Sequence, residues 1–171
     1  MRKYDIPKLL LSGENQGVEF KEAKNSFPKD GMKTICSFAN TNNGLLILGV
    51  SENTKNKDFY ISGVNDPDKV LDELYSLLNN PNKINRNVIN EESVEVVNIK
   101  GKEIVIIPVN KVDYKDKPIY LNDNIASTYF RQGTGDFRCS QEQINSMLRD
   151  SAKESFDSTL IQDFSILDLD T

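Results

Sequence analysis

The chain has 171 residues, 37% of them hydrophobic and 27% charged, which is the composition of a soluble globular protein with one domain. It contains no histidine, which excludes a Ser-His-Asp or Cys-His catalytic site and any imidazole metal ligand. The formal net charge of −5 argues against a strongly basic nucleic-acid-binding protein.

The negative charge is concentrated at the end of the chain. Residues 151–171 carry five acidic side chains and one lysine, which leaves 20 basic and 21 acidic side chains in residues 1–150. The longest apolar run, residues 45–50, is too short to span a membrane, and Cys36 and Cys139 form no CxxC pair. We therefore expect a cytoplasmic protein without membrane contact, whose cysteines are reduced and packed in the interior.

Helices and strands alternate in the first half of the chain. The periodicity predicts a helix at 4–13, a strand at 17–23, a helix at about 30–41, a central strand at 45–50 and a further strand at 57–64. The run at 45–50 is apolar throughout, which is typical of a strand that is covered on both faces.

The second half is richer in strands. The pattern predicts a helix at 65–80, strands at 93–100, 102–110, 118–122 and 126–133, and a last helix at 140–150. Asp66 is a candidate N-cap, Lys100-Gly101 a candidate hairpin turn, and Ser140 with Gln143 a candidate capping box. This order predicts an α/β (α+β) domain with a mixed sheet flanked by helices.

The stretch GENQGVEFKEA places two glutamates five residues apart. Alternation puts Glu19 and Lys21 on one face of the strand, and this pattern alone favours solvated charges with a weak ion pair. Glu14 would point to the opposite face of a continuous strand, so the two carboxylates can converge only if the chain bends. Gly13 and Gly17 permit such a bend.

Two further segments carry candidate site residues. Glu52 follows the apolar run 45–50 and would lie where that strand leaves the sheet, although an ordinary loop charge explains it equally well. In YFRQGTGDFRCS, Arg131 and Arg138 flank two glycines and a threonine. This segment is either a backbone concavity that binds phosphate or a plain tight turn before the last helix.

Four separated motifs together resemble the Schlafen/AlbA-like family. They are ENQGVEFKEA, SFANTNNGLLILGVSE, YISGV, and a late PIY followed by YFRQG, and they cover most of residues 12–150. The resemblance implies a single Schlafen/AlbA-2-like lobe that binds nucleic acid, either DNA or RNA, within a bacterial type of transcriptional regulator or helicase-like protein.

The resemblance also implies a site. In animal Schlafens the equivalent domain is a metal-dependent endoribonuclease that cleaves transfer RNA and similar structured RNAs with three carboxylates, and these correspond to Glu14, Glu19 and Glu52. The family pattern has an aspartate where this chain has Glu52. Lys21 matches the lysine of the EFK motif and Arg131 the arginine of YxRxG.

Three functions follow from these observations. The first is a nuclease in which Glu14, Glu19 and Glu52 hold Mg²⁺ or Mn²⁺, without an organic cofactor, and Lys21 assists catalysis. The second is a non-catalytic nucleic-acid-binding module that contacts the backbone through Lys21, Arg131 and Arg138. The third is a protein-interaction domain.

The Schlafen nuclease pairs two lobes into a clamp, so this single lobe would need to form a homodimer. We expect residues 1–150 to form the domain. Residues 151–171 would be an acidic tail or a linker to a further domain.

Overall fold

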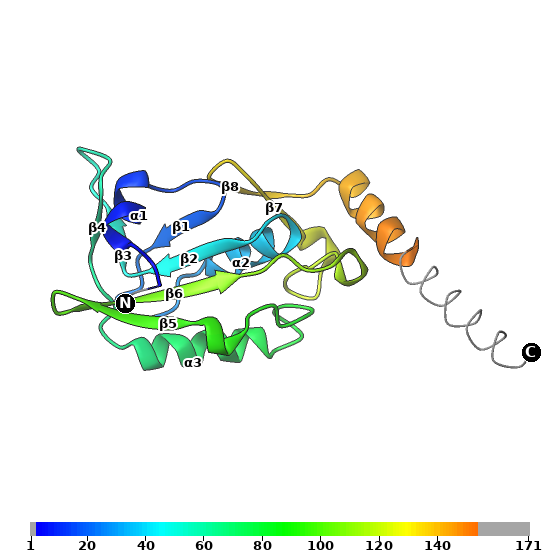
Figure 1. Cartoon of the computed structure of the whole chain (residues 1–171). Helices are drawn as coiled ribbons and strands as arrows, with labels where there is room; N and C mark the ends of the chain where they lie inside the picture. Colours follow the sequence, from blue (N-terminus) through cyan, green and yellow to red (C-terminus); the bar gives the residue numbers. More distant parts are fainter. Residues whose placement is uncertain (1–2, 154–171) are drawn as a thin grey trace, which may run out of the picture.

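The computed structural model describes residues 3–153, which form a mixed sheet with helices on both faces (Figure 1). The central sheet contains, in spatial order, β1 (Val18–Lys21), β2 (Gly44–Leu48), β6 (Lys102–Val109) and β5 (Glu95–Ile99). β1 runs parallel to β2, and the other neighbouring strands are antiparallel. The predicted α+β architecture is therefore confirmed. No helix within residues 3–153 is long and apolar enough to cross a membrane.

One face of the sheet is covered by α2 (Gly31–Asn40) and α3 (Pro67–Leu78). Their apolar stripes pack on the alternate sheet residues that point toward them, and this larger core includes Ile35, Phe38, Leu46, Leu74, Val105 and Ile107. Asp66 caps α3 as predicted, because its Oδ1 accepts the Lys69 N–H at 3.1 Å. Cys36 and Cys139 are buried and not bonded to each other.

The opposite face is covered by α1 (Ile6–Ser12) and by a small two-stranded sheet of β3 (Val50–Glu52) and β4 (Phe59–Ile61). Val18 and Phe20 of β1 point into this second core, as the alternation predicts. The Phe59 ring packs against the Phe20 ring with centroids 4.8 Å apart. Glu19 and Lys21 consequently lie on the other face of β1, toward α2.

Gly49 divides the predicted central strand in two. The prediction of one strand at 45–50 is wrong, because Gly49 has φ +98° and turns the chain out of the central sheet. A side chain there would meet Val64 Cγ2 at 3.1 Å and the Glu103 carbonyl oxygen at 3.2 Å. The residues after Gly49 pair instead with β4, so the strand predicted at 57–64 is the short partner in this hairpin.

The remaining strands form two hairpins. Lys100 and Gly101 make the tight turn between β5 and β6, both with positive φ, which confirms that predicted turn. β7 (Tyr129–Gln132) pairs with β8 (Gly135–Arg138) across a two-residue turn. Residues 118–122 form only isolated bridges, so the strand predicted there is wrong. Short 3₁₀ turns occupy Glu91–Ser93, Tyr114–Asp116 and Ile125–Ser127.

The last described helix begins after Ser140 and continues to Lys153 (the orange ribbon in Figure 1). Its predicted capping box is confirmed. The Ser140 N–H donates to Gln143 Oε1 at 2.7 Å, and the Gln143 N–H donates to Ser140 Oγ at 3.1 Å. The predicted acidic tail lies mostly outside the described residues.

Candidate functional site

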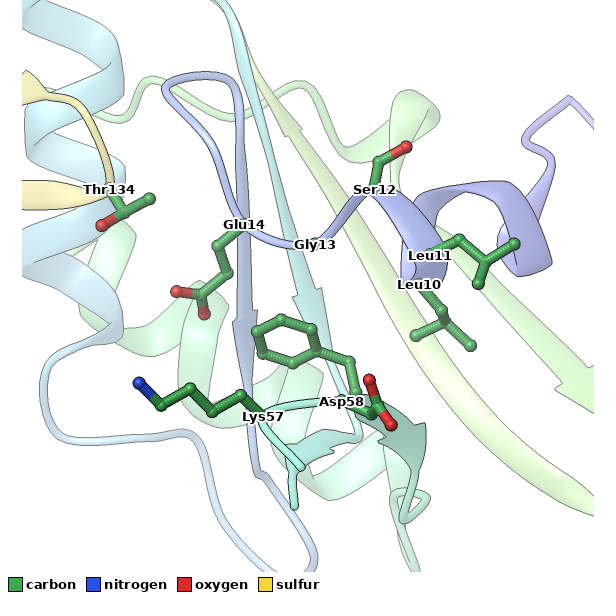
Figure 2. A pocket seen from close by; sticks show the side chains of 9 residues that line it. Leu10, Leu11, Ser12, Gly13, Glu14, Lys57, Asp58 and Thr134 are labelled. Carbon is green, nitrogen blue, oxygen red and sulfur yellow. The ribbon is translucent and has the colours of Figure 1, made fainter. Parts of the chain in front are cut away.

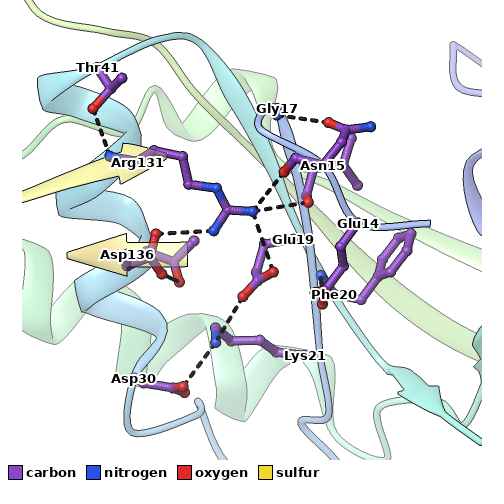
Figure 3. Close-up of polar contacts among 12 residues, drawn as sticks. Glu14, Asn15, Gly17, Glu19, Phe20, Lys21, Asp30, Thr41, Arg131 and Asp136 are labelled. Atoms are coloured by element: carbon purple, nitrogen blue, oxygen red, sulfur yellow. Dashed lines mark hydrogen bonds and ion pairs between the residues drawn. The ribbon is translucent and has the colours of Figure 1, made fainter. Parts of the chain in front are cut away.

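The guanidinium of Arg131 lies in the interior between the β7–β8 hairpin and β1. Its side chain has no exposed surface. It donates to Asp136 Oδ1 at 3.0 Å and to the carbonyl oxygens of Asn15 at 2.8 Å and Val18 at 3.2 Å (Figure 3). The Phe38 ring of α2 lies below it, with the centroid 4.9 Å from Arg131 Cζ. This set of acceptors compensates for removing the cation from water.

Glu19 lies between two cations on the α2 side of β1. Its Oε2 is 3.5 Å from Arg131 Nη2, and its Oε1 is 3.6 Å from Lys21 Nζ. Lys21 Nζ also binds Asp30 Oδ2 at 3.0 Å, so charges of alternating sign run from Asp136 to Asp30 (Figure 3). Glu19 is only 9% exposed, and the solvated strand surface that its sequence pattern favours is therefore wrong.

Glu14 reaches the same network from the loop before β1. Gly13 has φ +73°, and an isolated bridge between Asn15 and Val18 folds the loop back on the strand. Glu14 Oε1 accepts the Phe20 N–H at 3.2 Å, and its carboxyl group also lies within hydrogen-bonding reach of Glu19. The bend that the glycines permit is thus present, and it brings the two carboxyl groups together.

Burial raises the pKa of Glu19, and the negative charge of Glu14 raises it further. Lys21 and Arg131 act in the opposite direction, and the resulting pKa is about 7. The series of ion pairs from Asp136 to Asp30 contains two cations and three carboxylates, and Glu14 adds a fourth carboxylate. A proton held by Glu19 near neutral pH therefore reduces an excess of negative charge.

Glu14 connects this network to a pocket on the side of α1. A pocket of about 550 Å³ lies between the end of α1, the loop before β4 and the turn of the β7–β8 hairpin. Figure 2 shows the carboxylate of Glu14 and the amine of Lys57 pointing into this space, with Thr134 at its side. The ring of Phe59 and the leucines at the end of α1 supply apolar wall.

Two further cations lie beside Tyr129, the first residue of β7. Lys33 Nζ lies 5.3 Å from the centroid of the Tyr129 ring, and Arg138 Cζ lies 5.7 Å from it. Arg138 is exposed on β8, directly across the hairpin from Tyr129. α2 and the hairpin thus present two cations and an aromatic ring on one surface.

The sequence model of the Schlafen, AlbA_2 family matches residues 14–140. That range begins at Glu14, ends at Ser140 and includes the whole charged network. The chain belongs to the Schlafen, AlbA_2 family. Among curated proteins, none matches this chain.

Two solved structures share the fold of this Schlafen, AlbA_2 domain. One is the N-terminal domain of a protein from Nitrosomonas europaea related to the ATP-dependent DNA helicase RecG, with 30% identity and a TM-score of 0.54 over 72% of this chain and 82% of that one. The other is the DIP2311 protein from Corynebacterium diphtheriae, with 20% identity and a TM-score of 0.52. It shows the fold alone, and the match covers 78% of this chain and 24% of that protein.

The three carboxylates that the family resemblance implies do not form one group in this Schlafen, AlbA_2 domain. Glu52 ends β3, is exposed, and pairs across the small hairpin with Phe59, because Gly49 has already turned the chain out of the central sheet. Within residues 3–153, no three Cys, Asp or Glu side chains are placed to hold one metal ion. The arrangement does not fit a three-carboxylate metal site, and that ligand set stays a prediction.

Arg131, which the sequence predicts to bind nucleic acid, is buried in the interior of the domain. A nucleic-acid contact needs an accessible guanidinium, whereas Arg131 is fully buried and joins β7 to β1. The predicted phosphate concavity is also replaced by a regular hairpin, in which Gln132 pairs with Gly135 around the turn. Arg138 is the exposed arginine of this segment, and Lys21 is nearly buried in the network.

Sequence reasoning missed Asp136, which binds Arg131 directly. A signal was present, because a two-residue turn at Gly133-Thr134 places Arg131 opposite Asp136 in the hairpin. Thr34 of α2 donates its hydroxyl to Asp136 Oδ2 at 2.7 Å and holds the carboxylate in place. Lys33 and Tyr129 were also missed, since nothing local in the sequence indicates that α2 and β7 meet.

Proposed function

We propose that this domain binds nucleic acid through the surface formed by α2 and the β7–β8 hairpin. The observation that carries the proposal is the pair of cations, Lys33 and Arg138, beside the half-buried Tyr129 ring. Backbone-tracking cations together with an aromatic ring are the usual elements of a surface that binds single strands. Family membership and the 30%-identical domain of a RecG-related protein support the proposal.

The cations of this surface are not neutralised by carboxylates. Of the ion pairs among residues 3–153, none includes Lys33 or Arg138, whereas Lys21 and Arg131 are both committed to the buried network. A cation that lies on an aromatic ring keeps N–H groups for a phosphate oxygen. The basic surface therefore exists in spite of the net charge of −5.

Fluorescence anisotropy with labelled single-stranded RNA, single-stranded DNA and a tRNA-like hairpin at two salt concentrations tests the proposal. We expect binding that weakens steeply with salt, and at least a few-fold weaker binding in Lys33→Ala and Arg138→Ala. Lys100→Ala is the matched control, because Lys100 lies at the β5–β6 turn, far from the hairpin (Figure 1). No binding of any probe up to about 100 μM protein would overturn the proposal.

The same titrations address two finer parts of the proposal, namely the choice between tRNA-like RNA and DNA and a homodimeric binding unit. A single lobe with few phosphate contacts would bind weakly, and two lobes on one strand would gain affinity by linkage. Sedimentation of the complex gives the stoichiometry directly. A one-to-one complex would exclude the homodimer and leave nucleic-acid binding intact.

Endoribonuclease activity is a second candidate, which the contact between Glu14 and Glu19 beside an open pocket favours. A divalent ion would supply Lewis-acid chemistry, but the described side chains do not assemble a three-carboxylate site for it. Incubation of tRNA-like RNA with Mn²⁺ or Mg²⁺ checks this candidate. Cleavage that Glu14→Gln abolishes would support it, and intact RNA after long incubation would exclude it.

A further inference from the structure

A second cavity lies at the N-terminus of α2, next to the surface proposed to bind nucleic acid. Its volume is about 470 Å³, within the range of pockets that hold small organic ligands. Lys29 comes from the loop just before α2, Lys33 from the first turn of α2, and Lys83 from the loop after α3. Met32, Leu77 and Tyr129 supply an apolar wall. The cavity therefore combines three amines with a surface suited to a planar ring.

The acidic side chains of this cavity are already engaged. Asp30 binds Lys21 at 3.0 Å, and Glu73 Oε2 accepts the Phe27 N–H at 3.0 Å while its Oε1 lies 4.0 Å from Lys69. In contrast, Lys29, Lys33 and Lys83 take part in none of the ion pairs within residues 3–153. The positive charge of the lysines is consequently available to an anionic ligand.

The N-terminus of α2 adds to this positive potential. Asp30 occupies the N-cap position but makes no capping hydrogen bond, because its carboxylate is drawn to Lys21. Gly31 follows without a side chain, and the Phe27 ring lies so close that a Cβ there would be 2.5 Å from it. The Phe27 ring thus packs against the start of this ten-residue helix, while the helix dipole adds a partial positive charge at the end where Lys29 and Lys33 lie.

We infer that this cavity is a subsite for one nucleotide of a single strand, an assignment that rests on the proposed function. The phosphate lies at Lys29, Lys33 and Lys83, and the base lies against Met32, Leu77 and Tyr129. A base inside a duplex is stacked between its neighbours and cannot enter such a cavity, so the subsite selects unpaired nucleotides. Arg138, whose Cζ lies 5.7 Å from the centroid of the Tyr129 ring, would contact the neighbouring phosphate.

Binding of a fluorescein-labelled eight-nucleotide single strand, and of the same sequence as a duplex, tests the subsite. We expect the double variant Lys29→Ala/Lys83→Ala to bind the single strand about ten-fold more weakly, with a salt slope lower by up to about 0.7, because both lysines lie at one phosphate. Both lysines are exposed, so the fold should be retained, and thermal unfolding checks this. Lys100→Ala is again the control.

The base contact needs its own variant. Tyr129→Leu keeps apolar bulk but removes the ring, and it should weaken single-strand binding several-fold while leaving the salt slope unchanged. Amide NMR shifts of residues 29–33 should move with a nucleoside monophosphate, and move less with inorganic phosphate. Equal shifts with both probes would overturn the base contact.

Failure of the subsite and failure of the proposed function give different results. If the wild-type domain binds no probe, the proposed function is wrong and the subsite with it. If the wild-type domain binds and the double variant binds equally well with the same salt slope, only the subsite is wrong. Tighter binding of the duplex than of the single strand would likewise overturn the subsite alone.

Discussion

The guanidinium of Arg131 joins segments of the chain that are more than one hundred residues apart, and it does so without exposed surface. Its charge is compensated by Asp136 and Glu19 and by two backbone carbonyl oxygens. A buried cation of this kind contributes little net free energy as a pair, but its removal leaves unpaired carboxylates in the interior. Arg131 is therefore a positioning residue that fixes Glu19 and the loop before β1.

Replacing Arg131 with methionine should destabilise the domain strongly. We expect the free energy of unfolding to fall by about 3–5 kcal/mol, because Asp136 and Glu19 lose their buried cation. Arg138→Met is a matched control on the adjacent strand. Its side chain is exposed, and we expect a change below about 1 kcal/mol. Urea unfolding at pH 7 measures both, and equal stability of the two variants would contradict the structural role of Arg131.

Glu19 should make the stability of the domain depend on pH. Its pKa is raised from 4.5 to about 7 by burial and by Glu14, so between these values the folded chain keeps a proton that the unfolded chain has lost. The stability that Glu19 contributes is thus complete below pH 4.5 and decreases as the pH rises to 7, with a slope of up to about 1.4 kcal/mol per pH unit.

Glu19→Gln removes this titration and provides the measurement. We expect the stability of Glu19→Gln relative to wild type to improve steadily between pH 5 and pH 7 in urea unfolding experiments. The exposed substitution Gln16→Ala should show a difference that does not change with pH. Parallel stability curves for wild type and Glu19→Gln would show that Glu19 titrates as an ordinary carboxylate.

At the scale of elements, local signals located the starts of two helices correctly. Asp66 and the Ser140–Gln143 capping box act through hydrogen bonds within four residues, so the sequence contains the whole interaction. Strand boundaries were less predictable. The apolar run at 45–50 continues through the point where the chain leaves one sheet for another, because both sheets bury apolar side chains.

In the candidate site, too, features that depend on neighbouring residues could be predicted from the sequence, and features that depend on distant residues could not. The bend that brings Glu14 to Glu19 could be anticipated from Gly13, which takes a positive φ. The burial of Glu19 could not, because it depends on the β7–β8 hairpin, more than one hundred residues away along the chain. Alternation along a strand distinguishes its two faces but does not reveal which face another part of the chain will cover.

Gly49 offers a test of the turn between β2 and β3. Gly49→Ala should lower the free energy of unfolding by about 2–3 kcal/mol, because it combines a positive φ with close approach to Val64 and Glu103. Gly101→Ala is the matched control. Gly101 also has positive φ, but a Cβ there meets nothing within 4 Å, so about 1 kcal/mol is expected. Equal losses in urea unfolding would contradict the crowding at Gly49.

At the scale of the whole molecule, charge is segregated in a way that the net charge of −5 conceals. Carboxylates gather in the buried network and in the acidic end of the sequence, while unpaired lysines surround the start of α2. Asp30 connects the two regions, since it lines the cavity beside the lysines while its carboxylate pairs with Lys21. The network thereby leaves the adjoining surface more positive, which is the property that a phosphate-binding face requires.

The contact from Arg131 to Asn15 also bears on how the domain acquires its structure. The two residues are 116 positions apart, and contacts of such separation form late because a long loop must first be closed. On the ribosome, β1 emerges long before Arg131, so Glu19 has only Lys21 as a nearby cation until the β7–β8 hairpin has been synthesised. Maturation of the candidate site therefore coincides with completion of the domain, and a prematurely terminated chain lacks it.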